Sequence, residues 1–309
     1  MPYLAHSFVS PKADGSDTSL VRPSNWNDIL EYTTDAVFSP TGTNAYVREC
    51  LAGNRTYYVR TDGSDSNNGL ANTAGGAFVT IQHAYDVACQ TLDFRGNSVT
   101  IQIADGTYTG GIVSSFAWGV AGNLIIQGNT ATPANVVINT TDYSFYFGGY
   151  GGPGRLYLKG FKMTTSVSGC PISIQTTTGL YDISAVSFGG TAGSNLGCIN
   201  VGGPFCRVEV SGAIAISGTT PAMLNAYNGA QIECFNPTFT ITGTPAWSWN
   251  GVRAASCARV SIGSITFSGA ATGTRYDVSQ NAIVDTFGGG ATFIPGSVAG
   301  VTSSQGQYL

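Results

Sequence analysis

Charged residues are scarce in this chain. They make up 10% of its 309 residues, against about 25% in an average soluble domain. A surface with so few charges has to be covered by Gly, Ser, Thr, Asn and backbone groups, which suits stacked strands with short polar turns better than amphipathic helices. The net charge of −4 is accompanied by no run of Lys or Arg, so the sequence gives no sign of nucleic-acid binding.

Long apolar runs are also missing. No stretch reaches the roughly 18 apolar residues that a transmembrane helix needs, so we expect no membrane insertion. The first residues, MPYLAHSFVSPKADG, have neither the charged start nor the apolar centre of a secretory signal peptide. We therefore expect the protein to be made in the cytoplasm and not to use the standard secretion route.

Cysteines are present, but without the spacing of a metal site. There is no CxxC pair among the seven, and only two histidines accompany them. Zinc sites need closely spaced ligands, so we expect no metal site and no cofactor. Free cysteine is among the residues most often buried, which favours thiols packed in the core, although disulfides stay open as an alternative outside the cell. The seven are Cys50, Cys89, Cys170, Cys198, Cys206, Cys234 and Cys257.

A repeat follows residue 99. Its unit is an apolar–x–apolar pair, a small residue and a second apolar–x–apolar pair. Copies start at 156, 181, 208, 232 and 260, so the steps are 25, 27, 24 and 28 residues, and weaker copies start at 99 and 124. The copies at 208 and 232 are looser, because they carry extra residues before the second pair. A constant period in the twenties indicates a solenoid, because so small a unit cannot bury its apolar face alone.

The repeat predicts an all-β fold, a right-handed single-stranded parallel β-helix with rungs of about 25 residues. The alternation puts one face of each strand inward and the other outward. The small residue between the pairs fits a bend where the strand turns a corner. Leucine-rich repeats share the period, but their Leu/Asn consensus is absent.

The residues before the repeat predict a cap. Tyr57–Val59 reads as a short strand, and residues 61–69 are rich in turn formers. Apolar residues from 78 to 88 then follow helical spacing. We predict a helix over about 80–92, with Thr80 as N-cap, that covers the open end of the stack. The expected organisation is 1–55 as an N-terminal attachment region, 56–98 as first strand and capping helix, 99–295 as β-helix and 296–309 as C-terminal tail.

Three segments resemble phage proteins. YYV at 57–59, GSDSNNG at 63–69 and FVTIQHA at 78–84 resemble the opening of pectate-lyase-like β-helices in tail spikes and polysaccharide lyases. Residues 7–27 resemble the leader of phage and prophage tail-fibre proteins, and residues 293–308 resemble a fibre C-terminus. The resemblance implies a homotrimeric virion appendage, a tail fibre or tail spike. It would be assembled in the bacterial cytoplasm, joined to other tail or baseplate proteins through its N-terminal region, and exposed after release.

Carboxylates are the first candidate site. Asp182, Glu209 and Glu233 each lie between the apolar residues of a first pair, so they point outward from neighbouring rungs about 4.8 Å apart. Two carboxylates at that spacing can act as a retaining glycosidase pair or bind a hard cation. The ordinary alternative is an acidic row neutralised by arginines, of which Arg207, Arg253 and Arg259 are the candidates.

Aromatic residues are the second candidate site. Their faces stack on sugars while their polar edges bond hydroxyls. The candidate glycan-binding residues are Tyr143, Tyr146, Tyr150, Trp247 and Trp249. The alternative is that Phe145 and Phe147 point into the core while Tyr146 and Tyr150 pack between subunits.

Three functions stay open at this point. The first is a receptor-binding adhesin that contacts host cell-surface polysaccharide without cleaving it, which agrees with the scarcity of acid and base residues. The second is a tail-spike depolymerase, a polysaccharide lyase or glycoside hydrolase acting through the carboxylates. The third is a structural connector or head-decorating spike.

Overall fold

The computed structural model describes residues 3–4, 30–31, 48–114, 122–149, 154–166, 169–175, 178–191 and 196–309. The chain divides into two units, Met1–Glu49 and Cys50–Leu309. In the first unit, β1 (Tyr3–Leu4) and β2 (Leu30–Glu31) form an antiparallel pair. Most of the predicted attachment region lies outside the described residues.

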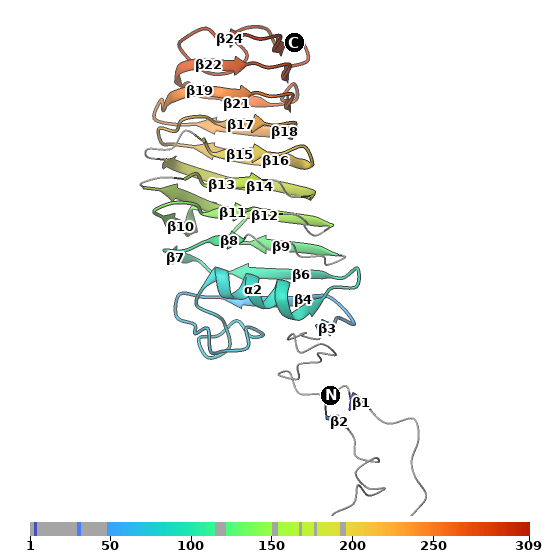
Figure 1. Ribbon diagram of the computed structural model, residues 1–309. Coiled ribbons are helices and arrows are strands. Elements are labelled where there is room, and N and C mark those ends of the chain that lie inside the picture. The colour runs from blue at the N-terminus through green and yellow to red at the C-terminus, as the bar shows by residue number, and fades with distance from the viewer. Residues whose placement is uncertain are drawn as a thin grey trace, which may run out of the picture. The chain divides into compact units, whose positions relative to one another are not determined.

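The second unit is a parallel β-helix of about seven turns, called rungs below (Figure 1). Successive rungs contribute strands to two long parallel sheets. The first sheet contains β4 (Arg55–Val59), β6 (Ser98–Ile103), β9 (Asn123–Gln127), β12 (Arg155–Thr165), β14 (Gly179–Thr191), β16 (Cys206–Ile216), β18 (Gln231–Ile241), β20 (Arg259–Ser261), β23 (Ile283–Asp285) and β25 (Gln307–Tyr308), with β7 (Gly106–Tyr108), β10 (Val136–Thr140) and β21 (Thr266–Ser268) pairing alongside. The second sheet contains β8 (Ile112–Ser114), β11 (Phe145–Phe147), β13 (Ile172–Gln175), β15 (Ile199–Gly202), β17 (Leu224–Tyr227), β19 (Ala246–Ala254), β22 (Thr272–Val278) and β24 (Val301–Thr302).

The strand register confirms the repeat. The residues at which the predicted copies begin are stacked on one another in the first sheet: Val99, Leu124, Leu156, Tyr181, Val208, Ile232 and Val260. Each step of the sequence repeat is therefore one rung, and the predicted right-handed β-helix is confirmed.

The bend between the two apolar pairs is a stack of left-handed residues. Gly160, Ala185, Gly212 and Asn236 have φ values of 83°, 50°, 67° and 49°. A residue in this conformation turns β12, β14, β16 and β18 around the corner of the rung. The extra residues of the looser copies are absorbed at the same place, where the register shifts between β14 and β16 and again between β16 and β18.

The space inside the rungs is a continuous apolar core. Inward residues of both sheets are buried, and aromatic rings join the rungs. Phe145 lies 5.4 Å from Phe161 on the next rung, and Phe147 lies 5.7 Å from Tyr181 on the rung after that (centroid distances). None of the seven cysteines forms a disulfide, and five of them are buried, as predicted; Cys50 and Cys257 are exposed. Burial raises the pKa of Cys198 to about 12, so that thiol is unreactive at neutral pH.

The predicted helix is present as α2 (Ile81–Thr91). The Thr80 hydroxyl accepts a hydrogen bond from the backbone N–H of His83, so Thr80 is the N-cap as predicted. The helix buries one apolar face against the first rungs. The described residues contain no helix long and apolar enough to cross a membrane.

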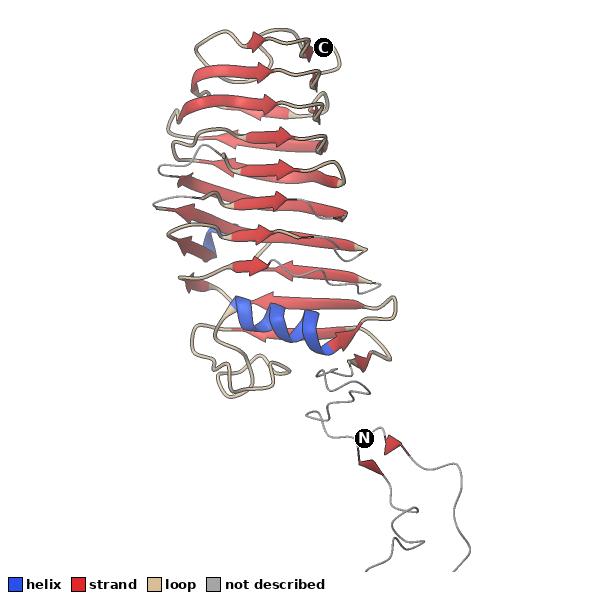
Figure 2. Cartoon of the chain, in the orientation of Figure 1, coloured by secondary structure: helices blue, strands red, loops and turns tan. Residues whose placement is uncertain are grey.

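Helix α2 also covers the unpaired edge of the second sheet (Figure 2). Among the strands that the structure describes, β8 pairs with β11 alone. On its other side the backbone N–H of Val113 donates to Gln82 Oε1 at 2.8 Å, and Tyr85 Oη donates to Ser114 Oγ at 3.0 Å. The helix thus satisfies groups that an open sheet edge would leave free.

The aromatic, glycine-rich segment contains strand β11, in which Phe145 and Phe147 point into the core, as the alternative interpretation predicted. One segment differs from the prediction. The segment 296–309, expected to be a separate tail, contains β24 and β25, which pair with β22 and β23 and continue both sheets. The remaining short elements are β3 (Glu49–Cys50), β5 (Leu92–Asp93) and the 3-10 helix η1 (Pro133–Asn135).

Candidate functional site

The three candidate carboxylates lie side by side, as the sequence indicated. Asp182 on β14 pairs with Glu209 on β16, which pairs with Glu233 on β18. The neighbours of each acid in its strand point into the core, so the carboxylates share the outer face of the first sheet.

Two arginines bridge these carboxylates. Arg155 Nη2 lies 3.1 Å from Asp182 Oδ2 and 2.5 Å from Glu209 Oε2. Arg207 Nη2 lies 3.2 Å from Glu209 Oε1 and 2.7 Å from Glu233 Oε2. We call these five residues the charged row. Each arginine holds two acids on successive rungs, and the Glu209 side chain is only 13% exposed.

The charged row matches the arrangement expected of a neutralised acidic stripe. Arg207 was among the predicted partners, whereas Arg155 was not. Arg253 and Arg259 instead pair with Asp277 at 3.8 Å and with Asp285 at 3.2 Å. Among the described residues, no group of three or more His, Cys, Asp or Glu side chains is placed to hold a metal ion.

A sequence signal for Arg155 did exist. It stands immediately before the first apolar residue of its copy, as Arg207 and Arg259 do in theirs. Residues at one position of a solenoid repeat lie on one line, two residues from the line of acids. Aligning the copies by position would therefore have paired basic with acidic side chains.

Tyrosines gather on the outer face of the second sheet. The rings of Tyr143 and Tyr146 lie 4.9 Å apart between centroids, and the ring of Tyr227 on β17 covers Gly202, its partner on β15, on the same face of the sheet. We call these three residues the tyrosine patch. Glycines leave room for the rings, because a Cβ at Gly148 would collide with Tyr146 and one at Gly202 would collide with Tyr227.

A hydrogen-bonded polar ladder underlies the tyrosine patch. Asn225 Nδ2 donates to Asn200 Oδ1 at 2.7 Å, and Asn200 Nδ2 donates to Ser173 Oγ at 3.2 Å. These three side chains are at most 2% exposed although they lie on the outward side of their strands. Burial raises the pKa of Tyr227, and a hydrogen bond with Asn200 opposes that rise. The hydrogen bonds of this ladder hold rigid the surface against which the tyrosine rings pack.

The two tryptophans have different surroundings. Trp247 is 3% exposed, and its indole N–H donates to the carbonyl of Pro295 at 2.7 Å, so its ring has no face open to a ligand. Trp249 is half-buried, and the Arg253 guanidinium lies 4.4 Å from its ring centroid. We therefore keep Trp249 as a surface candidate and leave Trp247 out. Tyr150 lies outside the described residues.

Tyr227 is the residue that the sequence interpretation missed. It follows Asn225 by two positions on β17, whereas the repeat was traced only through strands of the first sheet. Tracing the second sheet would have put Tyr227 on the same outward side as Asn225 and hence next to the predicted aromatic residues.

Comparison of the chain with protein-family models, with curated proteins and with solved structures found no match.

Proposed function

We propose that this chain is a subunit of a phage tail fibre or tail spike, and that it contacts host cell-surface glycan without cleaving it. The proposal places the protein on the virion, as a homotrimer attached through its N-terminal region. It joins the resemblance of the N- and C-terminal segments to phage fibres with the surface chemistry of the β-helix.

The tyrosine patch is the observation that supports glycan contact. The neighbouring aromatic rings pack over glycines and over the hydrogen-bonded polar ladder. Tyr143 and Tyr146 are only partly buried, so part of each ring is open to a ligand. Such rings offer flat apolar faces to sugar rings and hydroxyls to their edges. A rigid base lowers the entropy lost on binding.

The test is binding of the purified protein to a panel of immobilised bacterial lipopolysaccharides and capsular polysaccharides. For any glycan that is bound, the Tyr143→Ala, Tyr146→Ala double variant is expected to weaken binding by about tenfold or more. Tyr157→Ala is the matched control, because Tyr157 is also a half-buried outward tyrosine but lies on the first sheet beside Arg155. Equal loss in both variants, or binding that survives the double variant unchanged, would contradict the proposal.

The depolymerase stays as the alternative, and the charged row is the observation that favours it. Its carboxylates have neighbouring positions on adjacent strands, as a retaining pair requires. Each carboxylate, however, already forms an ion pair with an arginine. The size distribution of each bound glycan after incubation separates the two functions. Shortening of the glycan that is lost in Glu233→Gln would replace the adhesin with an enzyme, whereas unchanged glycan size supports the adhesin. A protein that binds no host cell at all would favour the connector.

A further inference from the structure

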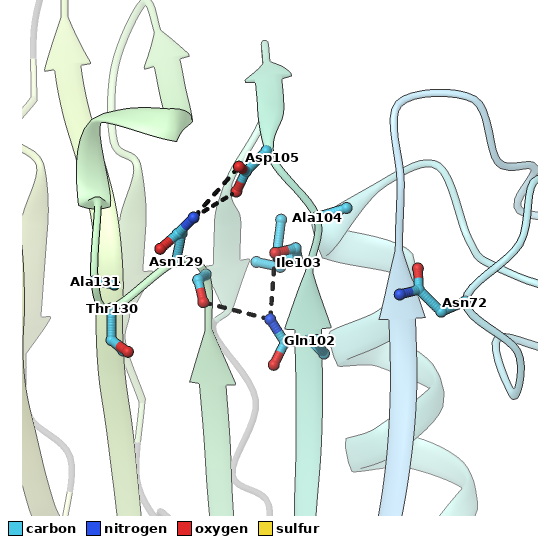
Figure 3. Close-up of a pocket in the computed structure, with 9 residues that line it drawn as sticks. Asn72, Gln102, Ile103, Ala104, Asp105, Asn129, Thr130 and Ala131 are labelled. Atoms are coloured by element: carbon cyan, nitrogen blue, oxygen red, sulfur yellow. Dashed lines mark hydrogen bonds between the residues drawn. The ribbon is translucent and has the colours of Figure 1, made fainter.

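A separate cavity lies near the N-terminal end of the β-helix, away from both candidate sites. It has a volume of about 300 Å³ and is formed where the turns after β6 and β9 face the loop before α2. Five polar side chains line it: Asn72, Gln102, Asp105, Asn129 and Thr130. Figure 3 shows these side chains gathered around the space between the loop and the two turns. We propose that this cavity binds one unit of a neutral, hydroxyl-rich sugar.

Asp105 is held in place by neutral groups. Asn129 Nδ2 donates to Asp105 Oδ1 at 3.0 Å and to Asp105 Oδ2 at 3.3 Å. Asn135 Nδ2 also donates to Asp105 Oδ2, at 3.0 Å. No described basic side chain forms an ion pair with Asp105, in contrast to the acids of the charged row. The carboxylate is therefore oriented without being neutralised, so it can accept hydrogen bonds from a ligand.

Gln102 and Asn72 are each oriented by the bonds they already make. Gln102 Nε2 lies within 3.3–3.4 Å of three backbone carbonyls, those of residues 103, 127 and 128, so the donor end of the amide is occupied and Oε1 is left as an acceptor (Figure 3). Asn72 Oδ1 accepts from Arg60 Nη1 at 3.2 Å, which leaves its Nδ2 as a donor. The cavity thus presents fixed acceptors and one fixed donor.

The wall that carries Asn72 is itself well anchored. Asn67 Nδ2 donates to the backbone carbonyls of Ala74 and Ala77 at 2.9 and 2.7 Å, which closes the loop on itself. The cavity is therefore formed before any ligand arrives, as most small-molecule sites are.

This lining selects a class of ligand. Hydroxyl groups both donate and accept, so they match a surface that mixes carboxylate, amide and hydroxyl groups. An acidic ligand would be repelled by Asp105, and a wholly apolar ligand would leave the polar side chains of the lining without partners. The volume is at the lower end of the range for small-molecule sites, about 300 to 1,000 Å³, which suits one sugar ring and not a longer oligosaccharide.

The experiment is saturation-transfer NMR and calorimetry on the full chain. The probes are methyl glycosides of glucose, galactose and N-acetylglucosamine, with methyl glucuronide as the acidic comparison. We expect transfer to at least one neutral glycoside, weaker or absent transfer to the glucuronide, and a loss of affinity of about tenfold or more in Asp105→Asn. Asp285→Asn is the matched control, because Asp285 is a paired acid on a distant rung of the same sheet.

A second variant guards against misfolding. Asn72→Ala removes an exposed loop side chain and is expected to weaken binding while leaving the melting temperature unchanged. No transfer to any neutral glycoside, or equal affinity in wild type, Asp105→Asn and Asn72→Ala, would overturn the proposal. An oligosaccharide that ends in the bound sugar shows whether the natural ligand is a glycan end or a free sugar. If it binds as tightly as the methyl glycoside or more tightly, the site takes a glycan end; if it binds more weakly, the site takes a free sugar. The Tyr143→Ala, Tyr146→Ala variant should bind these probes normally, so this site and the tyrosine patch can fail independently.

Discussion

At the scale of single residues, backbone conformation selects the residue at the bend of each rung. Gly160 has φ of +83°, and a Cβ there would lie 2.8 Å from backbone atoms of Asn129. Ala185 and Asn236 adopt the same left-handed conformation with a side chain present, and a Cβ added at Gly212 would come no nearer than 3.7 Å to the Ser184 side chain. Glycine is therefore required at the bend that contains Gly160, whereas the bends of other rungs accept residues with a side chain.

We predict that Gly160→Ala lowers the free energy of unfolding by about 1–3 kcal/mol, because the new methyl group meets the backbone and the left-handed conformation becomes strained. Gly75→Ala is the control, since its Cβ would meet no atom within 4 Å, and a change within about 0.5 kcal/mol is expected there. Urea unfolding followed by circular dichroism measures both. Indistinguishable midpoints for the two variants would refute the explanation of the bend.

Residue-level features were predictable where strand alternation decides them. The outward position of Glu209 follows from the buried Val208 and Val210 on either side, and the inward Phe145 follows in the same way. The burial of Trp247 could not be predicted, because it depends on a carbonyl 48 residues later in the sequence. Contacts of that kind exist only once the rungs are stacked.

At the scale of elements, the start of helix α2 is tied to the turn-rich loop before it. Asp65 Oδ1 accepts the backbone N–H groups of Val79 and Thr80 at 3.0 Å each, and its Oδ2 accepts the Thr80 hydroxyl at 2.7 Å. The same hydroxyl caps the helix through His83. One carboxylate thus joins the loop to the cap of the β-helix.

Acid should weaken this junction. Burial acts to raise the pKa of Asp65, but the hydrogen bonds from Thr80 and Val79 outweigh it, and the pKa is lowered. The unfolded value is about 3.9, so the stabilisation is fully present above about pH 4 and is lost as pH falls through the lower folded-state pKa. We predict that Asp65→Asn melts below wild type at about pH 7 and that the gap narrows on acidification toward about pH 3. Melting curves across that range test this, and a gap independent of pH would contradict it.

The sequence predicted the elements unequally well. The helix expected over 80–92 occupies Ile81–Thr91, because its capping residue and apolar spacing are local signals. The long strands of the first sheet were found through the repeat. The second sheet was not traced, since strands such as β11 and β13 have only three or four residues and the turns between them vary in length.

At the scale of the whole molecule, exposed aromatic side chains accompany the scarcity of charge. Phe205, Phe235 and Phe287 are 70%, 50% and 71% exposed. Apolar side chains that form a contiguous exposed patch commonly mark a surface that a partner covers. In the homotrimer that we propose, the second and third copies of the chain would cover these side chains.

We therefore predict a native mass near three times the chain mass of 31.9 kDa, measured by light scattering in dilute solution. The Phe235→Ser, Phe287→Ser double variant should raise the monomer fraction, because it removes apolar surface from the expected interfaces. Leu70→Ser, which changes a 49% exposed side chain on the loop before α2, serves as control. A wild-type monomer would contradict the trimer.

The charged row has a mechanical consequence. Hydrogen bonds between rungs run along the axis of a β-helix, so tension along the axis loads the layers in series and opens the weakest layer first. Arg155 and Arg207 tie three successive carboxylate-bearing rungs together, whereas β23 and β25 are joined over only two residue pairs. Under tension along the axis, the pairing between β23 and β25 would open first, while the rungs joined by Arg155 and Arg207 would keep their spacing. The tension would therefore fall in steps, one pair of strands at a time.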